Sequence, residues 1–306
     1  MWSRLRSTLW NMENCQFWRV ILLLLYFNKT NTHWPFHLDY ISLILLKLSI
    51  TKAISWFQMD WNEFPVHCLV QVLTRVGMES LVQTVPLVCK SWYDATFYPQ
   101  CWQRLLFHKS PYNLQTPKSS WLGFGLLHQH TEEDALEKFL HFAVGRSHGL
   151  VTELIFPSQS RLKEGQIAWI AQRCPSLKLL VLPNHLSYVI NFEVSSSICK
   201  WKDLEGLQIS SLIGLKTTIA NISKNCPKFS HLSAYVPRLD GDVALAIASQ
   251  LPHIRTLDLR FSTIQRHDLL LILKGCQKLE HLHISDHADD DILQVAPHVR
   301  VFKHLN

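Results

Sequence analysis

The densest group of side chains that could bind a metal lies near the C-terminal end of the chain, in the segment EHLHISDHADDD. If this segment begins as a strand, His281 and His283 point to the same side of it. Asp286, His287 and Asp289 follow closely. Imidazole and carboxylate groups bind zinc, but a closed zinc site requires about four of them in tetrahedral positions. We therefore favour the alternative that the two strand histidines simply face solvent, and we predict no bound metal and no cofactor.

The eight cysteines do not show the spacing of a zinc site or of a redox motif, since no two of them form C-x-x-C. Cys174, Cys226 and Cys276 each precede by six residues a leucine that recurs through the second half of the chain, and Leu251 takes the same place in another copy. A position that accepts leucine is a packing position, and not that of a nucleophile or a ligand. A chain of this size needs no disulfides, so we expect reduced thiols in a cytoplasmic or nuclear protein.

Patterns for other functions are missing from the sequence. There is no Walker loop, no G-x-G-x-x-G, no G-x-S-x-G and no H-E-x-x-H. The formal net charge is +6, but residues 1–58 carry +4 of it, and the remaining +2 does not favour nucleic-acid binding. We therefore predict no catalytic residues, and we expect that the chain is not itself an enzyme.

Residues 151–306 contain a motif that returns at intervals of 25 to 27 residues. Its central leucines are Leu154, Leu180, Leu207, Leu232, Leu257 and Leu282. A fixed period in this range is typical of leucine-rich repeats. Amphipathic segments such as DVALAIASQL separate the copies, so we predict one strand and one helix per repeat in a right-handed α/β solenoid. The tail, HVRVFKHLN, would be a last strand that caps the stack.

The residues that flank each central leucine should line the concave face of this solenoid, where such proteins usually bind partners. Aligning the repeats gives three columns: His231 with Thr256 and His281, Ser233 with Asp258 and His283, and Tyr235 with Arg260 and Ser285. An aromatic residue, an arginine and several histidines suit a polar protein partner. A face that is merely solvated is the alternative. The predicted target-binding residues are His231, Tyr235, Asp258, Arg260, His281 and His283.

Residues 59–107 have the pattern of four short helices. After Pro65, which suits a first helical turn, one apolar stripe runs through Val66, Leu69, Val70, Leu73 and Val76 and stops at Gly77. Shorter stripes follow at Leu81, Val82 and Val85, then at Val88, Cys89 and Trp92, and then, after Pro99, at Trp102, Leu105 and Leu106. Four short helices bury little by themselves. This unit should therefore pack on its neighbour or present an apolar surface to a partner.

The same segment resembles an F-box. Phe64 and Pro65 take the place of the family's Leu-Pro, and the segment VCKSW, which ends at Trp92, matches its Val-Cys-(Lys/Arg)-x-Trp motif. Trp102 matches the family's later tryptophan. The repeats resemble the cysteine-containing leucine-rich repeats that commonly follow an F-box, as in plant F-box/leucine-rich-repeat proteins.

This resemblance implies binding to the Skp-type adaptor of a cullin–RING (SCF) ubiquitin ligase, and through it to the cullin and RING subunits. The implied adaptor contacts are Phe64, Pro65, Leu69, Leu73, Leu87, Val88 and Trp92. The chain would then be the substrate-recognition subunit, with an unknown target protein held by the repeats. An F-box protein that binds the adaptor as a scaffold, without ubiquitin transfer, is an alternative.

The two remaining segments are a connection and an extension. Residues 108–150 should form a linker and then a helix that starts near Thr131 and caps the solenoid. In residues 1–58, the apolar run VILLLLYF is too short for a stable membrane span. It does resemble a signal-peptide core, and Asn28 opens a glycosylation sequon. We favour an unstructured or spurious extension; a secreted leucine-rich-repeat binding protein is the alternative.

Overall fold

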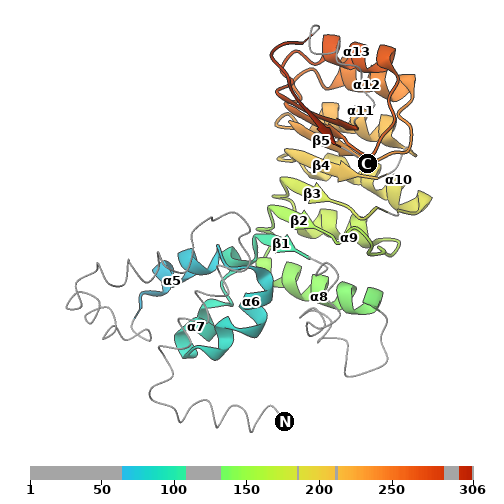
Figure 1. Ribbon diagram of the computed structural model, residues 1–306. Helices are drawn as coiled ribbons and strands as arrows, with labels where there is room; N and C mark the ends of the chain where they lie inside the picture. Colours follow the sequence, from blue (N-terminus) through green and yellow to red (C-terminus); the bar gives the residue numbers. More distant parts are fainter. Residues whose placement is uncertain (1–63, 108–131, 185, 211–212, 286–295, 305–306) are drawn as a thin grey trace, which may run out of the picture. The chain divides into compact units, whose positions relative to one another are not determined.

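The computed structural model describes residues 64–107, 132–184, 186–210, 213–285 and 296–304. They divide into two compact units: a helical unit, which extends to Thr96, and a repeat unit, which continues from Phe97 and also includes Gly77–Glu79. Figure 1 shows the helical unit in blue to teal and the repeat unit from teal through green to red. The predicted extension, most of the predicted linker and the metal candidates Asp286, His287 and Asp289 fall outside the described residues.

The helical segments before Thr96 are α5 (Val66–Leu73), α6 (Met78–Gln83), the 3-10 turn η1 (Val85–Leu87) and α7 (Lys90–Ala95). Pro65 precedes the first helix rather than lying in its first turn, and its carbonyl accepts the N–H groups of Cys68 and Leu69 at 2.9 and 3.0 Å. Helix α5 ends at Leu73, before Gly77. Because Val66 is exposed, the buried stripe of α5 is shorter than predicted and consists of Leu69, Val70 and Leu73.

The predicted fourth helix is wrong. The 3-10 turn η2 (Pro99–Trp102) leads instead into a strand, β1 (Arg104–Leu106). Short apolar runs fit either element, and here parallel pairing decides, since Leu105 aligns with Leu154 in the next strand. The repeat sheet therefore begins inside the segment predicted as purely helical.

Among the described residues, eight parallel strands form one sheet in sequence order. They are β1, β2 (Glu153–Ile155), β3 (Leu179–Val181), β4 (Gly206–Ile209), β5 (His231–Ala234), β6 (Thr256–Leu259), β7 (His281–Ser285) and β8 (Arg300–His304). The six predicted central leucines pair with one another from strand to strand and are at most 2% exposed. The tail strand is confirmed, because β8 pairs with β7 and places Val301 beside Leu282.

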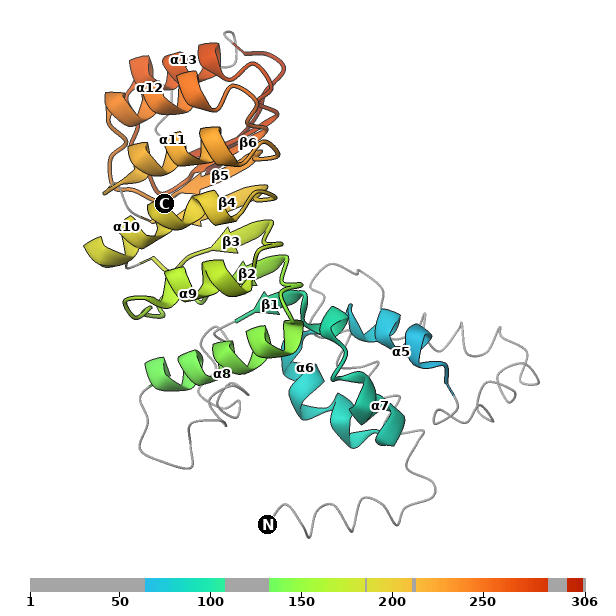
Figure 2. The same cartoon turned by 180° about the vertical axis from the view of Figure 1, so that it is seen from behind.

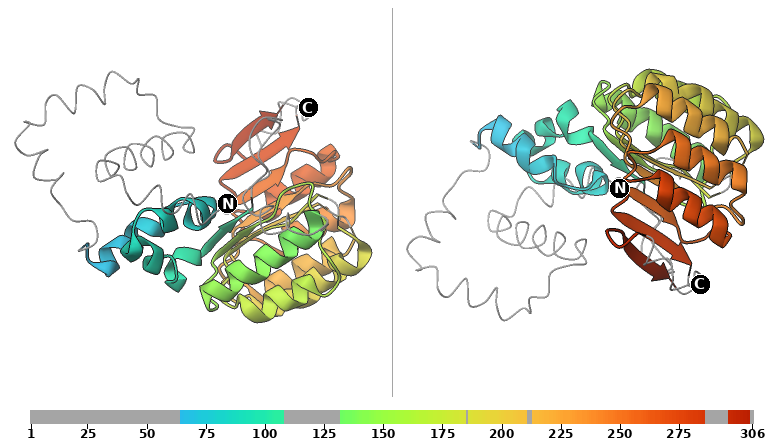
Figure 3. Two further views of the ribbon diagram at one scale, coloured as in Figure 1. Left: turned by 90° about the horizontal axis from the view of Figure 1, so that it is seen from below. Right: turned by 90° about the horizontal axis from the view of Figure 1, so that it is seen from above.

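A single layer of helices covers one face of this sheet and leaves the other face open (Figures 1 and 2). The layer consists of α8 (Glu132–Ser147), α9 (Gln166–Arg173), α10 (Tyr188–Ser197), α11 (Leu215–Asn225), α12 (Gly241–Gln250) and α13 (Arg266–Gly275). The views along the stack in Figure 3 show the same two layers from below and above. This arrangement is the predicted α/β repeat fold.

Helix α8 buries the predicted apolar side, with Leu136, Phe139, Leu140 and Ala143 all at most 2% exposed. However, it connects β1 to β2 and lies beside α9 as the first member of the helical layer (Figure 2). The first strand of the sheet is thus β1, and α8 is a repeat helix rather than an added cap.

Each of the three cysteines that recur before a central leucine ends a helix; we call Cys174, Cys226 and Cys276 the helix-end cysteines. The Cys226 thiol reaches back to the Trp201 carbonyl at 3.3 Å, and the Cys276 thiol to the Leu251 carbonyl at 3.7 Å. A thiol is a weak hydrogen-bond donor, so it can donate to a carbonyl that the end of the preceding helix leaves without an intrahelical partner. Leu251 and the fully buried Trp201 hold the same position in their own repeats.

Candidate protein-binding surfaces

The open face of the sheet brings the predicted target-binding residues into two columns along the strands. His231, Thr256 and His281 are neighbours in register, and so are Ser233, Asp258 and His283. Their side chains alternate with buried apolar residues, because successive strand residues point to opposite faces. Towards β1 the first column contains Gly206 and Leu179 and then Glu153 and Arg104, which form an ion pair, so this column is apolar only over β3 and β4.

Three residues on this face form one hydrogen-bonded cluster, which we call the Tyr–Asp–Arg cluster: Tyr235, Asp258 and Arg260. The guanidinium of Arg260 donates from Nη2 to Asp258 Oδ2 at 2.7 Å and from Nε to Oδ1 at 3.0 Å. The backbone N–H of Arg260 also donates to Oδ1, at 3.1 Å. The Tyr235 hydroxyl donates to Oδ2 at 3.3 Å, and the Arg260 Nη2 donates to that hydroxyl at 3.3 Å.

The electrostatics of the cluster follow from this geometry. Asp258 is 6% exposed, so its carboxylate is held under the surface while the Arg260 side chain keeps 35% of its area in solvent. Hydrogen bonding to Asp258 raises the pKa of Arg260 further above its usual range. Burial, followed by the Asp258 charge, raises the pKa of the Tyr235 hydroxyl. The cluster therefore keeps a neutral phenol beside a permanent cation and stiffens the centre of the open face.

Two exposed phenylalanines on this unit were missed from the sequence. Phe261 is 60% exposed and packs edge-on against Tyr235, with ring centroids 5.0 Å apart. Phe302 is 42% exposed and stacks on His283 at 4.7 Å. Phe302 could have been found from the sequence, because the in–out alternation of side chains along the tail strand places it on the open face. There it continues the column of Asp258 and His283. Exposed aromatics backed by a second ring are typical anchors of protein interfaces.

In the helical unit, the predicted adaptor contacts are divided between surface and interior. Leu87 is 50% exposed and Pro65 is also exposed, whereas Phe64, Val88 and Trp92 are half-buried. Leu69 and Leu73 are 1% and 0% exposed, and therefore belong to the core. Their contact with an adaptor stays a prediction.

Other exposed apolar side chains in the helical unit were not among the predicted contacts. Val66, Val72 and Tyr93 are each 43% to 45% exposed. The helical period places Val72 beside the buried stripe of α5 but places Val66 on it, so only the exposure of Val72 could have been expected from the sequence. Apolar side chains displayed from one small unit favour contact with a protein partner.

The part of the chain that the structure describes holds neither a cluster of metal ligands nor a membrane-spanning helix. Those residues contain no group of three or more His, Cys, Asp or Glu placed to hold a metal ion. Among the same residues, no helix has the combination of length and apolar character needed to cross a membrane.

Comparisons with known proteins agree with both parts of the chain. A family profile described as F-box-like matches residues 61–108. The F-box/LRR-repeat protein At3g48880 of Arabidopsis thaliana is 30% identical over 74% of this chain and 71% of its own length. The F-box proteins FBW2 and SKIP1 of the same plant are 27% and 23% identical, over 67% and 78% of their lengths. With the eight-stranded repeat sheet, these similarities show that the chain belongs to the F-box/LRR-repeat family.

Proposed function

We propose that this protein is the substrate-recognition subunit of an SCF-type ubiquitin ligase. The helical unit would bind a Skp-type adaptor, and the open sheet face would bind a target protein. Ubiquitin transfer would then follow from proximity, because holding a target beside a loaded enzyme raises its effective concentration. Such a role requires no reactive residue in this chain.

The observation that carries the proposal is the exposure of Leu87 in the segment that matches the F-box motif. Its side chain is 50% exposed, although full burial of a leucine contributes about 1.5–3 kcal/mol. A partner that covers Leu87 would gain much of this free energy. The F-box resemblance assigns this position to the adaptor.

Residue chemistry also supports a location in the cytoplasm or nucleus. No disulfide joins any of the seven cysteines in the described ranges, and several of them are buried. Reduced thiols are typical of those compartments, whereas secreted proteins usually oxidise them. This favours the ligase proposal over a secreted binding protein.

Leu87→Asp tests adaptor binding, and Leu245→Asp is its matched control. Leu245 lies on α12 of the repeat unit and is 54% exposed, so both changes place a charge at a similarly exposed leucine. We expect the full chain to bind a purified Skp-type adaptor in calorimetry. Leu87→Asp should weaken this binding at least tenfold, and Leu245→Asp less than twofold. Equal effects of the two changes, or no binding by the unmodified chain, would contradict the proposal.

A further inference from the structure

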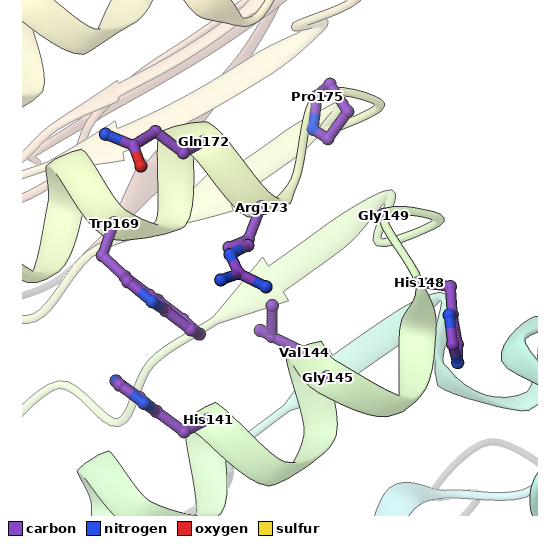
Figure 4. Close-up of a pocket in the computed structure, with 9 residues that line it drawn as sticks. All are labelled: His141, Val144, Gly145, His148, Gly149, Trp169, Gln172, Arg173 and Pro175. Atoms are coloured by element: carbon purple, nitrogen blue, oxygen red, sulfur yellow. The ribbon is translucent and has the colours of Figure 1, made fainter.

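A groove of about 650 Å³ lies on the helical side of the repeat unit, away from the open sheet face. It is formed by α8, the turn that follows α8, and the end of α9 (Figure 4). Nine residues line it and none of them is an aspartate or a glutamate, whereas Arg173, His141 and His148 are all present. The volume is within the range of small-ligand sites.

Arg173 is the central charge of this groove. Figure 4 shows its guanidinium between Trp169 and Val144. Among the described residues it makes no ion pair and no side-chain hydrogen bond, and its guanidinium carbon is 6.0 Å from the Trp169 ring centroid, at the limit of a cation–π contact. By contrast, Arg146 on α8 lies 3.9 Å from the ring centroid of Phe97.

Some other cations on the helical side are paired with acids. Lys163 contacts Asp134 and Glu137, each at 2.7 Å, and Lys216 contacts Asp242 at 2.9 Å. Among the described residues Arg173 forms no such ion pair, in contrast to Lys163 and Lys216. A guanidinium fork without a partner can donate two parallel hydrogen bonds to an anion.

The walls of the groove are preformed. The ring of His141 stacks on Trp169 with centroids 4.0 Å apart and planes 2° apart, so α8 and α9 hold one flat wall. His148 lines the opposite end; its φ of 48° is uncommon for a residue other than glycine. A Cβ on Gly145 would meet nothing within 4 Å, so the space above α8 is open.

We propose that this groove binds a phosphate monoester. One arginine balances a single carboxylate, but a phosphate monoester carries nearly two negative charges near neutral pH. The imidazoles of His141 and His148 line the same groove, and their ring N–H groups could donate further hydrogen bonds to the phosphate oxygens. The ester group would lie against the flat wall made by Trp169 and His141. The phosphate would belong either to a free small molecule or to a phosphorylated side chain.

Calorimetry on the full chain with phenyl phosphate tests this site. Inorganic phosphate and phenol serve as the charge-only and ring-only probes. NMR of protein labelled with ¹⁵N-arginine would follow the Arg173 Nε–H signal, assigned by its loss in Arg173→Gln. We expect saturable binding that shifts this signal, and at least tenfold weaker binding to Arg173→Gln. Arg238→Gln, the matched control at an exposed arginine of a loop, should change binding less than twofold.

Gly145→Glu supplies a second variant that does not depend on loss of structure. It adds an acid to the open groove and a better helix former to α8, so it should abolish binding while leaving the protein at least as stable. A short phosphotyrosine peptide that binds better than phenyl phosphate would identify a phosphorylated protein as the source; equal binding would identify a small phosphate. Binding of phenol as tight as that of phenyl phosphate, unchanged binding by either groove variant, or no saturable binding would overturn the proposal.

Discussion

Through the Tyr–Asp–Arg cluster, Asp258 should contribute to the free energy of unfolding of the repeat unit. Asp258→Ala removes a carboxylate that accepts hydrogen bonds from three donors of Arg260 and from the Tyr235 hydroxyl, at 2.7 to 3.3 Å. The carboxylate is almost completely buried, with 9% of its side chain exposed. Its loss leaves the donors without their shared acceptor.

The expected cost follows from the burial of the two partners. Breaking a fully buried ion pair costs about 3–5 kcal/mol, and an exposed pair contributes about 0–1 kcal/mol. Arg260 keeps 35% of its side chain exposed, so its guanidinium can regain water after the substitution. We therefore expect Asp258→Ala to lower the free energy of unfolding by about 2–3 kcal/mol, between these limits.

Asp242→Ala is the control for this prediction. Its ion pair with Lys216 has a similar length, 2.9 Å, but the two side chains are 75% and 60% exposed. Urea denaturation followed by circular dichroism should show a loss below about 0.5 kcal/mol for this variant. If Asp258→Ala were no more destabilising than Asp242→Ala, the assignment of the cluster as a stiffening element would be refuted.

Three further predictions concern stability. Burial raises the pKa of the helix-end cysteines to about 12 in Cys174 and about 11 in the other two. Because an unfolded thiol ionises near pH 9, the contribution of these thiols to stability is complete below that pH and is lost as the pH rises towards 11. The urea midpoint should therefore be lower at about pH 10 than at about pH 8. Gly275→Ala places a Cβ 2.5 Å from the Ala248 carbonyl oxygen and should lower the free energy of unfolding by about 1–3 kcal/mol, whereas Gly145→Ala, with open space around it, should raise it by up to about 1 kcal/mol, both measured in urea. Asp240 accepts the Val243 N–H at 2.8 Å as the N-cap of α12, so Asp240→Ala should cost about 1 kcal/mol in thermal or urea denaturation.

The repeat fold could be predicted because one residue type recurs at a fixed interval. The spacing of the central leucines indicates both the strands and their register, and it correctly places His281 beside Thr256. Strand β1 was missed because it has only three residues and its apolar residues also suit a helical period. Its pairing with β2 depends on residues about 50 positions away, which a local pattern does not show.

The candidate surfaces were harder to predict than the fold, because exposure depends on packing. The F-box resemblance gave equal weight to Leu69 and Leu87, yet one is buried and the other is 50% exposed. The sequence placed Asp258 on the open face but did not indicate that Arg260 would cover its carboxylate. The groove around Arg173 depends on two helices meeting at a particular distance, which no motif encodes.

The most direct test of the central proposal measures protein lifetimes in cells. Proteins captured by both the unmodified chain and Leu87→Asp would first be identified as targets. Their half-lives would then be compared between cells that express Leu87→Asp and cells that express the control, Leu245→Asp. We predict that Leu87→Asp still captures the targets but lengthens their half-lives, because the variant keeps the open sheet face and loses the adaptor. Targets degraded equally fast with both variants would contradict the account and favour a scaffold role.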